Sequence, residues 1–304
     1  MTRAPLLMVA ATCALVPAGQ DPAREAPATP IAAVLRDSTA ARLASIATGA
    51  NGTVGFLIAD LDGPDRFARL ENASFPAAST IKLAILYELF VQADEGRIRL
   101  DDVTPMERTR AVPGGLLYEL TAPALSNRDL AIAMILQSDN TATNVLIDRV
   151  GMPTVNSRME ALGLAGTRLR RHMIDLDAAR EGRENITTPA DLAQLLRVFH
   201  RGDGLTATSA AEALAILKKR KQTAISTGVP QAVAIASKSG ALEGVRADAG
   251  IVYVPGRPYV FVAMATFMKE ESGDPERPLA DLARTAYDYF DRRGTVSEYG
   301  RPIR

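Results

Sequence analysis

The pattern of apolar and polar positions gives the chain two strand-containing ends and a helical middle. From Ile31, apolar residues recur at helical spacing, which predicts a helix that stops near Gly49. The β-rich run 53–60 then predicts a strand, and 66–70 predicts a second strand that returns after the turn at 62–65.

Helical periodicity dominates the middle of the chain. We predict helices over residues 79–94, 129–136, 141–150, 153–162, 189–200 and 210–219. The segment 168–188 has no clean period and many charges, so it predicts a long loop. The basic run 218–221 at the end of the last helix is typical of a solvated cap that complements the helix dipole.

Strands return near the C-terminal end. We predict strands over 233–237, 249–254 and 259–268, followed by an amphipathic helix over 279–292. Strands at both ends predict an α/β fold of the α+β type. It consists of an antiparallel sheet flanked by helices, built from both termini, with an inserted all-α domain. The predicted boundaries are 31–72 and 205–304 for the α/β domain and 73–204 for the all-α domain.

The first residues predict export. Arg3 gives a positive start, 4–16 is apolar, and Val16-Pro17-Ala18 offers a small-residue cleavage site. Thirteen apolar residues are fewer than the ~20 that span a bilayer. We therefore expect a signal peptide over 1–18, a disordered linker over 19–30 and a secreted, periplasmic protein. A buried N-terminal helix is the alternative.

The single cysteine, Cys13, lies inside this predicted signal peptide. Its cleavage would leave a mature chain without a thiol, and therefore without a disulfide or a cysteine nucleophile. The preceding Ala10-Ala11-Thr12 is a poor lipoprotein cleavage box, so we do not expect a lipid anchor.

Charge and composition narrow the range of partners. Lysine plus arginine equals aspartate plus glutamate, at 35 each, so neither nucleic acid nor an anionic membrane is indicated. No HxH, HExxH or cysteine cluster suggests a metal, and we expect no cofactor. We interpret His172, Asp175 and Asp177 as parts of a polar loop, and we expect a monomer without stable membrane insertion.

Three short motifs occur in a fixed order: Ser79-Thr80-Ile81-Lys82, Ser138-Asp139-Asn140 and Lys238-Ser239-Gly240. Their joint occurrence by chance is on the order of 10⁻⁴. A serine hydroxyl needs an adjacent base to act as a nucleophile, and Lys82 lies one helical turn from Ser79. A lysine serves as that base only if desolvation or a second cation lowers its pKa, and Lys238 is the plausible second cation.

The other motif residues suit an acyl-transfer reaction on a substrate with an amide and a carboxylate. Ser138 offers a hydroxyl to relay a proton, and Asn140 offers an amide for hydrogen bonds to the substrate. Lys238 and Ser239 offer a charge and a hydroxyl for a carboxylate. We interpret Asp139 as a turn residue.

Two further positions follow the third motif. The backbone N–H groups of Ser79 and Ala241 would form the oxyanion hole, and Arg246 would help to bind the same carboxylate. No G-x-S-x-G is present, and neither histidine suggests a serine–histidine–acid triad.

On these motifs the chain resembles class A β-lactamases and the wider penicillin-recognising serine hydrolases, from about Ile31 to Ile303. Segments 75–82, 137–144 and 237–241 carry the resemblance. It implies an α/β domain joined to an all-α domain with the site between them. It also implies that Ser79 is acylated, that Lys82 is the base and that Lys238 and Arg246 hold the carboxylate of a β-lactam or of a D-alanyl peptide.

One element of the family pattern is missing. Family β-lactamases carry a glutamate in an E-x-x-L-N motif that activates the deacylating water, and the corresponding positions here, 172–174, contain none. Asp175 is our candidate replacement, with Glu181 or Glu184 as alternatives. A secreted β-lactamase-type hydrolase with slow deacylation is therefore the leading hypothesis. The alternatives are a D-alanyl-D-alanine peptidase or penicillin-binding esterase, and a non-hydrolytic β-lactam sensor.

Overall fold

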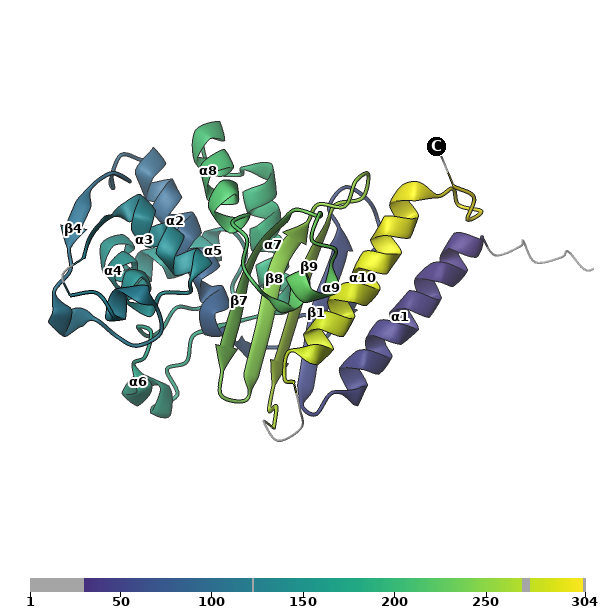
Figure 1. Ribbon diagram of the computed structural model, residues 1–304, viewed down its shortest axis with the longest axis horizontal. Helices are drawn as coiled ribbons and strands as arrows, with labels where there is room; N and C mark the ends of the chain where they lie inside the picture. Colours follow the sequence, from purple (N-terminus) through teal and green to yellow (C-terminus); the bar gives the residue numbers. More distant parts are fainter. Residues whose placement is uncertain (1–29, 122, 270–273, 303–304) are drawn as a thin grey trace, which may run out of the picture.

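The structure, a computed structural model, describes residues 30–121, 123–269 and 274–302. The predicted signal peptide, most of the linker and Cys13 lie outside these residues. A five-stranded antiparallel sheet in the order β2-β1-β9-β8-β7 lies at the centre of the fold (Figure 1). Its strands are β1 (Thr53–Asp60), β2 (Arg66–Arg69), β7 (Ile235–Leu242), β8 (Val245–Val252) and β9 (Tyr259–Thr266). The predicted fold class is therefore confirmed.

One face of the sheet is covered by the terminal helices α1 (Ile31–Gly49) and α10 (Arg277–Thr295), with the short α9 (Ala224–Gly228) beside them (Figure 1). Phe261 of the sheet and Phe290 of α10 are both fully buried here. Tyr259 stacks on Phe290 with ring centroids 4.3 Å apart. Each such aromatic side chain contributes roughly 2–3 kcal/mol through burial, so this cluster fixes the helices on the sheet.

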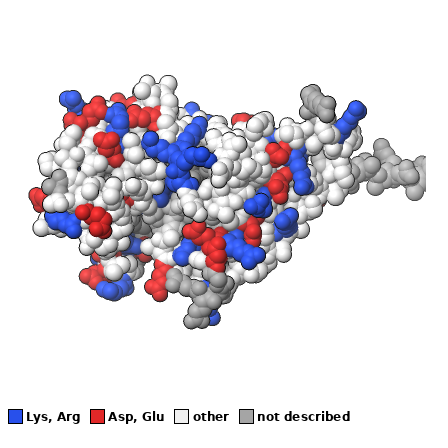
Figure 2. Space-filling model, viewed as in Figure 1, with Lys and Arg blue, Asp and Glu red and all other residues white. Residues whose placement is uncertain are grey.

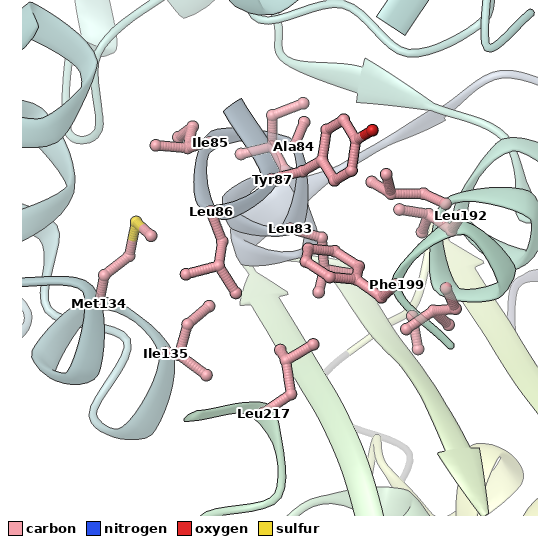
Figure 3. Packing of buried hydrophobic residues seen from close by; sticks show 14 of the residues in the cluster. Leu83, Ala84, Ile85, Leu86, Tyr87, Met134, Ile135, Leu192, Phe199 and Leu217 are labelled. Carbon is pink, nitrogen blue, oxygen red and sulfur yellow. The ribbon is translucent and has the colours of Figure 1, made fainter. Parts of the chain in front are cut away.

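Helices from the middle of the chain cover the other face. The helix α7 (Pro189–Arg201) packs on β1, β8 and β9. Beyond it lie α2 (Lys82–Asp94), α3 (Asn127–Leu136), α4 (Asn140–Val150), α5 (Met152–Ala161) and α8 (Ala207–Leu217). Figure 3 shows α2 among these helices, with Leu83, Leu86 and Tyr87 directed at neighbouring apolar side chains. Every residue of α2 from Lys82 to Gln92 is buried.

Short elements connect the helical region to the sheet. The pair β3 (Phe75–Pro76) and β6 (Ile186–Thr187) joins the segment before Ser79 to the end of the long loop. The pair β4 (Val103–Pro105) and β5 (Ala124–Ser126) brings together the two ends of the connection between α2 and α3. Single turns complete the region: η1 (Ala78–Ile81), η2 (Arg108–Arg110), η3 (Leu116–Tyr118) and α6 (Leu176–Arg180).

Several local predictions need correction: the strand predicted over 233–237, for example, runs from Ile235 to Leu242. Ser79 lies in the 3₁₀ turn η1, and the α-helix begins only at Lys82. Strand β8 starts at Val245, four residues before the predicted 249, because the polar Arg246 and Asp248 interrupt its apolar run. It forms a hairpin with β7 through Glu243 and Gly244. In the described part of the chain, no helix combines the length and hydropathy needed to span a membrane.

Candidate active site

Ser79 lies where the edge strand β7 meets the turn η1. Gly240 of β7 makes this approach possible, since a Cβ atom at position 240 would lie only 2.7 Å from the backbone nitrogen of Ser79. Ala78 adopts a left-handed conformation with φ +45°, which is costly for a residue with a side chain. The turn that presents the serine is therefore both strained and in close contact with the sheet.

Lys82 follows Ser79 and is completely buried. Its Nζ donates to the Ser138 carbonyl oxygen at 2.7 Å and to Asn140 Oδ1 at 2.9 Å, and it lies 3.1 Å from Ser138 Oγ. The second motif is thus joined to the first through one ammonium group. A lysine in these contacts is positioned to exchange a proton with the Ser138 hydroxyl.

Burial lowers the pKa of Lys82 well below its ordinary value, and the charge of Lys238 lowers it further. Asp139 opposes both effects by favouring the charged form. Desolvation and a neighbouring cation are the two conditions that allow a lysine to act as a base near neutral pH.

The Ser138-Asp139-Asn140 turn is held by an adjacent loop. Ser138 has φ +56°, in the left-handed region. The buried Asp139 carboxylate accepts hydrogen bonds from the backbone N–H of Ala142 at 2.8 Å, as the N-cap of α4, and of Leu117 at 2.8 Å. These contacts agree with the interpretation of Asp139 as a turn residue. Asn140 Nδ2 donates to the Pro113 carbonyl at 2.9 Å.

Lys238 is 2% exposed, and its Nζ donates to the carbonyl oxygen of Ser239 at 2.6 Å. Burial lowers the pKa of Lys238 to about 7; the charge of Lys221 contributes, and Asp248 opposes the shift. The next residue, Ser239, is half-buried, and Ala241 is exposed on β7. Because β7 is an edge strand, the backbone groups on its outer side face the site without a strand partner.

Arg246 lies on the same face of the sheet as Ser239 and Ala241, two of the other predicted substrate-binding residues, but not on that of Lys238. Arg246 pairs with Ala241, so its side chain starts on the face of the sheet opposite to that of Lys238 and Gly240. Its Nη1 donates to the carbonyl oxygens of Leu242 and Val245, at 2.7 and 2.8 Å. Side chains alternate between the two faces of a strand. The register of Arg246 in the β7–β8 hairpin, and not its distance from Lys238 in the sequence, therefore decides the face on which its side chain starts.

Asp175, the predicted base for deacylation, caps a short helix of the loop in this structure. Its carboxylate is exposed and caps the short helix α6 by accepting the Ala178 N–H at 3.0 Å. Glu181 pairs with Arg183. Glu184 pairs with Arg171, with 2.7 Å between Nη2 and Oε1.

None of these loop carboxylates is among the charges that shift the pKa of Lys82. In this structure the Asp175 carboxylate caps α6, and its role as the replacement for the missing glutamate stays a prediction.

The sequence patterns did not predict that the side chain of Met173, in the long loop, is buried. Met173 is 7% exposed, and Asn144 of α4 binds both its backbone groups: Oδ1 accepts the N–H at 2.7 Å, and Nδ2 donates to the carbonyl at 3.1 Å. Ile174 follows in a left-handed conformation with φ +64°. An apolar side chain thus lies inside the loop where the family pattern has a carboxylate. The available signal was the lone Asn144, one helical turn after Asn140.

Among the described residues, no group of three or more His, Cys, Asp and Glu side chains gathers to hold a metal ion.

The sequence matches the profile of the β-lactamase enzyme family over residues 38–290. The β-lactamase AST-1 of Nocardia asteroides is 29% identical over 254 residues, which cover 81% of this chain and 82% of that protein. The structure is similar to the β-lactamase of Sphaerobacter thermophilus, with a TM-score of 0.74 and 30% identity over 82% of this chain and 96% of that one. It is also similar to a mutant of PBP-A in an acyl-enzyme complex with penicillin G, with a TM-score of 0.75, 29% identity and coverage of 85% and 96%.

Proposed function

This chain belongs to the β-lactamase enzyme family and is a serine hydrolase of that type, and we propose that it opens β-lactam rings through an acyl-enzyme on Ser79 that is released slowly. The observation that carries the proposal is the buried Lys82 Nζ, 3.1 Å from Ser138 Oγ and under the charge of Lys238. The similar PBP-A structure, captured as a penicillin G acyl-enzyme, supports the same first step.

The acylation would proceed by three proton transfers. Neutral Lys82 takes the hydroxyl proton of Ser79 as Oγ attacks the lactam carbonyl carbon, and the N–H groups of Ser79 and Ala241 stabilise the oxyanion. The C–N bond of the ring then breaks. Ser138 delivers its proton to the leaving nitrogen and regains one from Lys82. The products are the Ser79 ester and a ring-opened amine, with no net change in protonation.

Lys238 and Ser239 would bind the substrate carboxylate, with Lys238 in its charged form. Asn140 would bind the amide of the substrate side chain while its Oδ1 stays on Lys82. Arg246 would also help to bind this carboxylate, because only its Nη1 donates to the hairpin carbonyl oxygens and the guanidinium has further N–H donors.

Deacylation requires a base for water, and none of the loop carboxylates Asp175, Glu181 and Glu184 is without a helix-capping or ion-pair partner. The lack of a free carboxylate among these three favours a second candidate function, a D-alanyl-D-alanine peptidase that β-lactams acylate. The buried Met173 is the specific observation behind it. Release of D-alanine from a diacetyl-L-lysyl-D-alanyl-D-alanine peptide, faster than nitrocefin hydrolysis, would establish this alternative over the first.

Intact-protein mass spectrometry after brief incubation with penicillin G tests the acyl-enzyme. We expect the mass of one penicillin on the wild-type protein and none on Ser79→Ala. With nitrocefin, a burst near one equivalent should precede a slow steady state. A wild-type protein that gains no mass and yields no hydrolysed product would contradict the proposal, as would an adduct that persists in Ser79→Ala.

We further propose that the chain is exported to the periplasm, loses about 18 residues at a signal cleavage site, and acts as a monomer. The apolar run 4–16 and the Val16-Pro17-Ala18 site support export. N-terminal sequencing of the secreted protein should begin near Gly19, and light scattering should give the mass of one chain. A cytosolic protein that retains Met1 would contradict export.

A further inference from the structure

A groove of about 1210 Å³ lies beside the first residues of β7. One wall is the segment 218–222, which follows α8, and another is the segment 229–235, which leads into β7. The turn of α9 and the side chains of Arg284, Tyr287 and Asp288 on α10 complete it. None of the residues assigned to acylation lines this groove, so it is distinct from the candidate active site.

Positive charge is concentrated in this groove. Its lining contains five cationic side chains and one carboxylate, that of Asp288; the cations are Lys218, Lys219, Arg220, Lys221 and Arg284. Figure 2 shows a dense group of basic side chains between α8 and β7, on a face where acidic and basic residues otherwise alternate. Because the whole chain has a formal net charge of zero, this excess is local.

These cations have no carboxylate within ion-pair distance in the described part of the chain, although the charge of Asp248 acts on Lys221. Elsewhere, Arg158 and Arg171 lie 2.9 and 2.7 Å from carboxylates of Glu88 and Glu184. Within residues 30–121, 123–269 and 274–302, none of the five groove cations forms an ion pair. A cluster of like charges without counter-ions raises the energy of the folded protein. A bound anion would relieve this repulsion.

The basic segment is held in place and not merely solvated. Lys221 Nζ returns to the Leu217 carbonyl at 2.7 Å, as expected for a cap at the end of α8. Lys218 is the C-cap residue of α8 through its backbone, but its side chain and that of Arg220 make other contacts. Lys218 lies 4.1 Å from the centre of the Tyr253 ring, and Arg220 Nη2 donates to the Gln231 carbonyl at 3.2 Å. A fixed segment loses less conformational entropy when it binds a ligand.

We propose that this groove binds a ligand that carries two or more phosphate groups. Phosphate fits because arginine offers paired N–H donors and lysine a point charge, the two groups that phosphate oxygens bind most strongly. More than one phosphate fits because the cations come from two walls, 218–221 and α10, and because the volume exceeds that of a single phosphate. The ligand is either a soluble oligophosphate or the headgroup of a lipid with two phosphates.

Isothermal titration calorimetry with tripolyphosphate at 50 mM NaCl tests the proposal. We expect saturable binding of one ligand per chain that weakens as salt rises, because salt screens the attraction. The variant Lys219→Gln/Arg220→Gln should bind at least tenfold more weakly. The matched control Arg99→Gln/Arg180→Gln removes the same charge from exposed positions outside the groove lining and should bind within twofold of the wild type.

Saturating penicillin G separates the groove from the acylation site. Binding of tripolyphosphate that persists in its presence supports the groove, whereas competition would place the anion near Lys238 and overturn the proposal. No binding by the wild type, or equal weakening in the control variant, would also overturn it. Neither result bears on acylation of Ser79, which the mass measurement tests separately.

Cardiolipin vesicles distinguish the two sources of phosphate. Sedimentation of the wild type with these vesicles, lost in Lys219→Gln/Arg220→Gln, would identify a lipid headgroup as the ligand. Binding of tripolyphosphate without sedimentation would identify a soluble oligophosphate. Sedimentation that the double variant retains, with no binding of tripolyphosphate, would contradict a phosphate site in this groove.

Discussion

The acylation residues and the long loop that borders them contrast in how their polar groups are used. Around Lys82 of α2, oxygen atoms of Ser138 and Asn140 converge on one buried nitrogen, and the charge of Lys238 acts on it from the sheet. In the loop, each carboxylate instead serves the loop itself: Asp175 caps α6 and Glu184 pairs with Arg171. Groups that assemble an acylation site are thus present without a group that activates water.

This difference separates two steps of the reaction of a β-lactamase, the formation of the acyl-enzyme and its hydrolysis. Forming the acyl-enzyme needs a nucleophile, a base and an anchor, and the described residues supply a candidate for each. Hydrolysing it needs a further base at the loop, where Met173 is buried. The following predictions test whether the two steps are as independent as the geometry suggests.

The largest effect is expected at Lys82. Replacing Lys82 by alanine should slow acylation by penicillin G by roughly 10²–10⁴, the range for loss of a general base. Lys82→Arg should not restore the rate, because a guanidinium keeps its proton near neutral pH. Stopped-flow measurement of the nitrocefin burst gives the rate, and a fully active arginine variant would remove Lys82 from this role.

Met173→Glu should have the next largest effect, in the opposite direction. The hydrogen bonds from Asn144 to the backbone of residue 173 would keep the new carboxylate at the loop position that faces inward. We therefore expect the steady-state rate of nitrocefin hydrolysis to rise by at least about tenfold, within the range for an added general base. Burial of a carboxylate should lower the stability by more than the roughly 1–3 kcal/mol that an unpaired neutral polar group costs. Met173→Gln, of similar length but without a base, is the matched control. Equal acceleration in both variants would contradict the idea.

The pH dependence of acylation should sharpen the role of Lys238. Its pKa of about 7 lies below its value in the unfolded chain, so the folded protein loses this charge as pH rises through 7. If the charged form binds the carboxylate, kcat/KM for penicillin G should fall by close to tenfold per unit above that pH. The methyl ester of penicillin G lacks the carboxylate and should show no such fall. Parallel profiles for acid and ester would argue against Lys238 as the anchor.

The same shift sets a direction for stability. Because the unfolded chain binds more protons than the folded one between pH 7 and the ordinary lysine pKa, the contribution of Lys238 to the free energy of unfolding should rise with pH across that window. Below pH 7 its full destabilising effect is present.

The smallest effect is expected at Asp175. Since its carboxylate is exposed and caps α6, Asp175→Asn should change the steady-state rate of nitrocefin hydrolysis by less than about twofold, because asparagine caps a helix as well as aspartate does. Asp175→Ala should cost roughly 0.5–2 kcal/mol of local stability at that helix. A steady state that collapses in Asp175→Asn while the burst survives would support the role first predicted for this residue.

Sequence patterns predicted the regular elements well because their apolar periods are long. The helix 31–49 and the strand 53–60 were placed within a residue of their observed ends. Strand β8 was shortened because Asp248, a buried carboxylate, looks like a loop residue in a pattern of hydropathy. The N–H of Ile225 stabilises it there by donating to Oδ2 at 2.9 Å, a long-range contact that no local pattern reveals.

In the candidate active site, too, local sequence patterns do not reveal long-range contacts. Motif spacing predicted that Ser79, Lys82 and Ser138 come together, since two of them share one turn and the third follows a predicted helix. The destination of Arg246 depended on the register of a two-residue hairpin, and a shift by one position reverses the face. The inward turn at Met173 depended on Asn144, which is outside the motif triplets. These details therefore depend on strand register and on contacts between elements, which the motifs alone do not specify.

The contact of Gly240 with the turn of Ser79 also has a consequence for the timing of activity. Ribosomal synthesis delivers the serine about midway between the N-terminus and α4, but the strand that carries Lys238 emerges only near the end of the chain. Until that strand docks, Lys82 lacks the neighbouring cation and the closed surroundings that depress its pKa. An incomplete or misfolded chain would therefore not be acylated by penicillin. A fluorescent penicillin would then label only finished molecules, which makes the adduct a direct count of native protein in a cell extract.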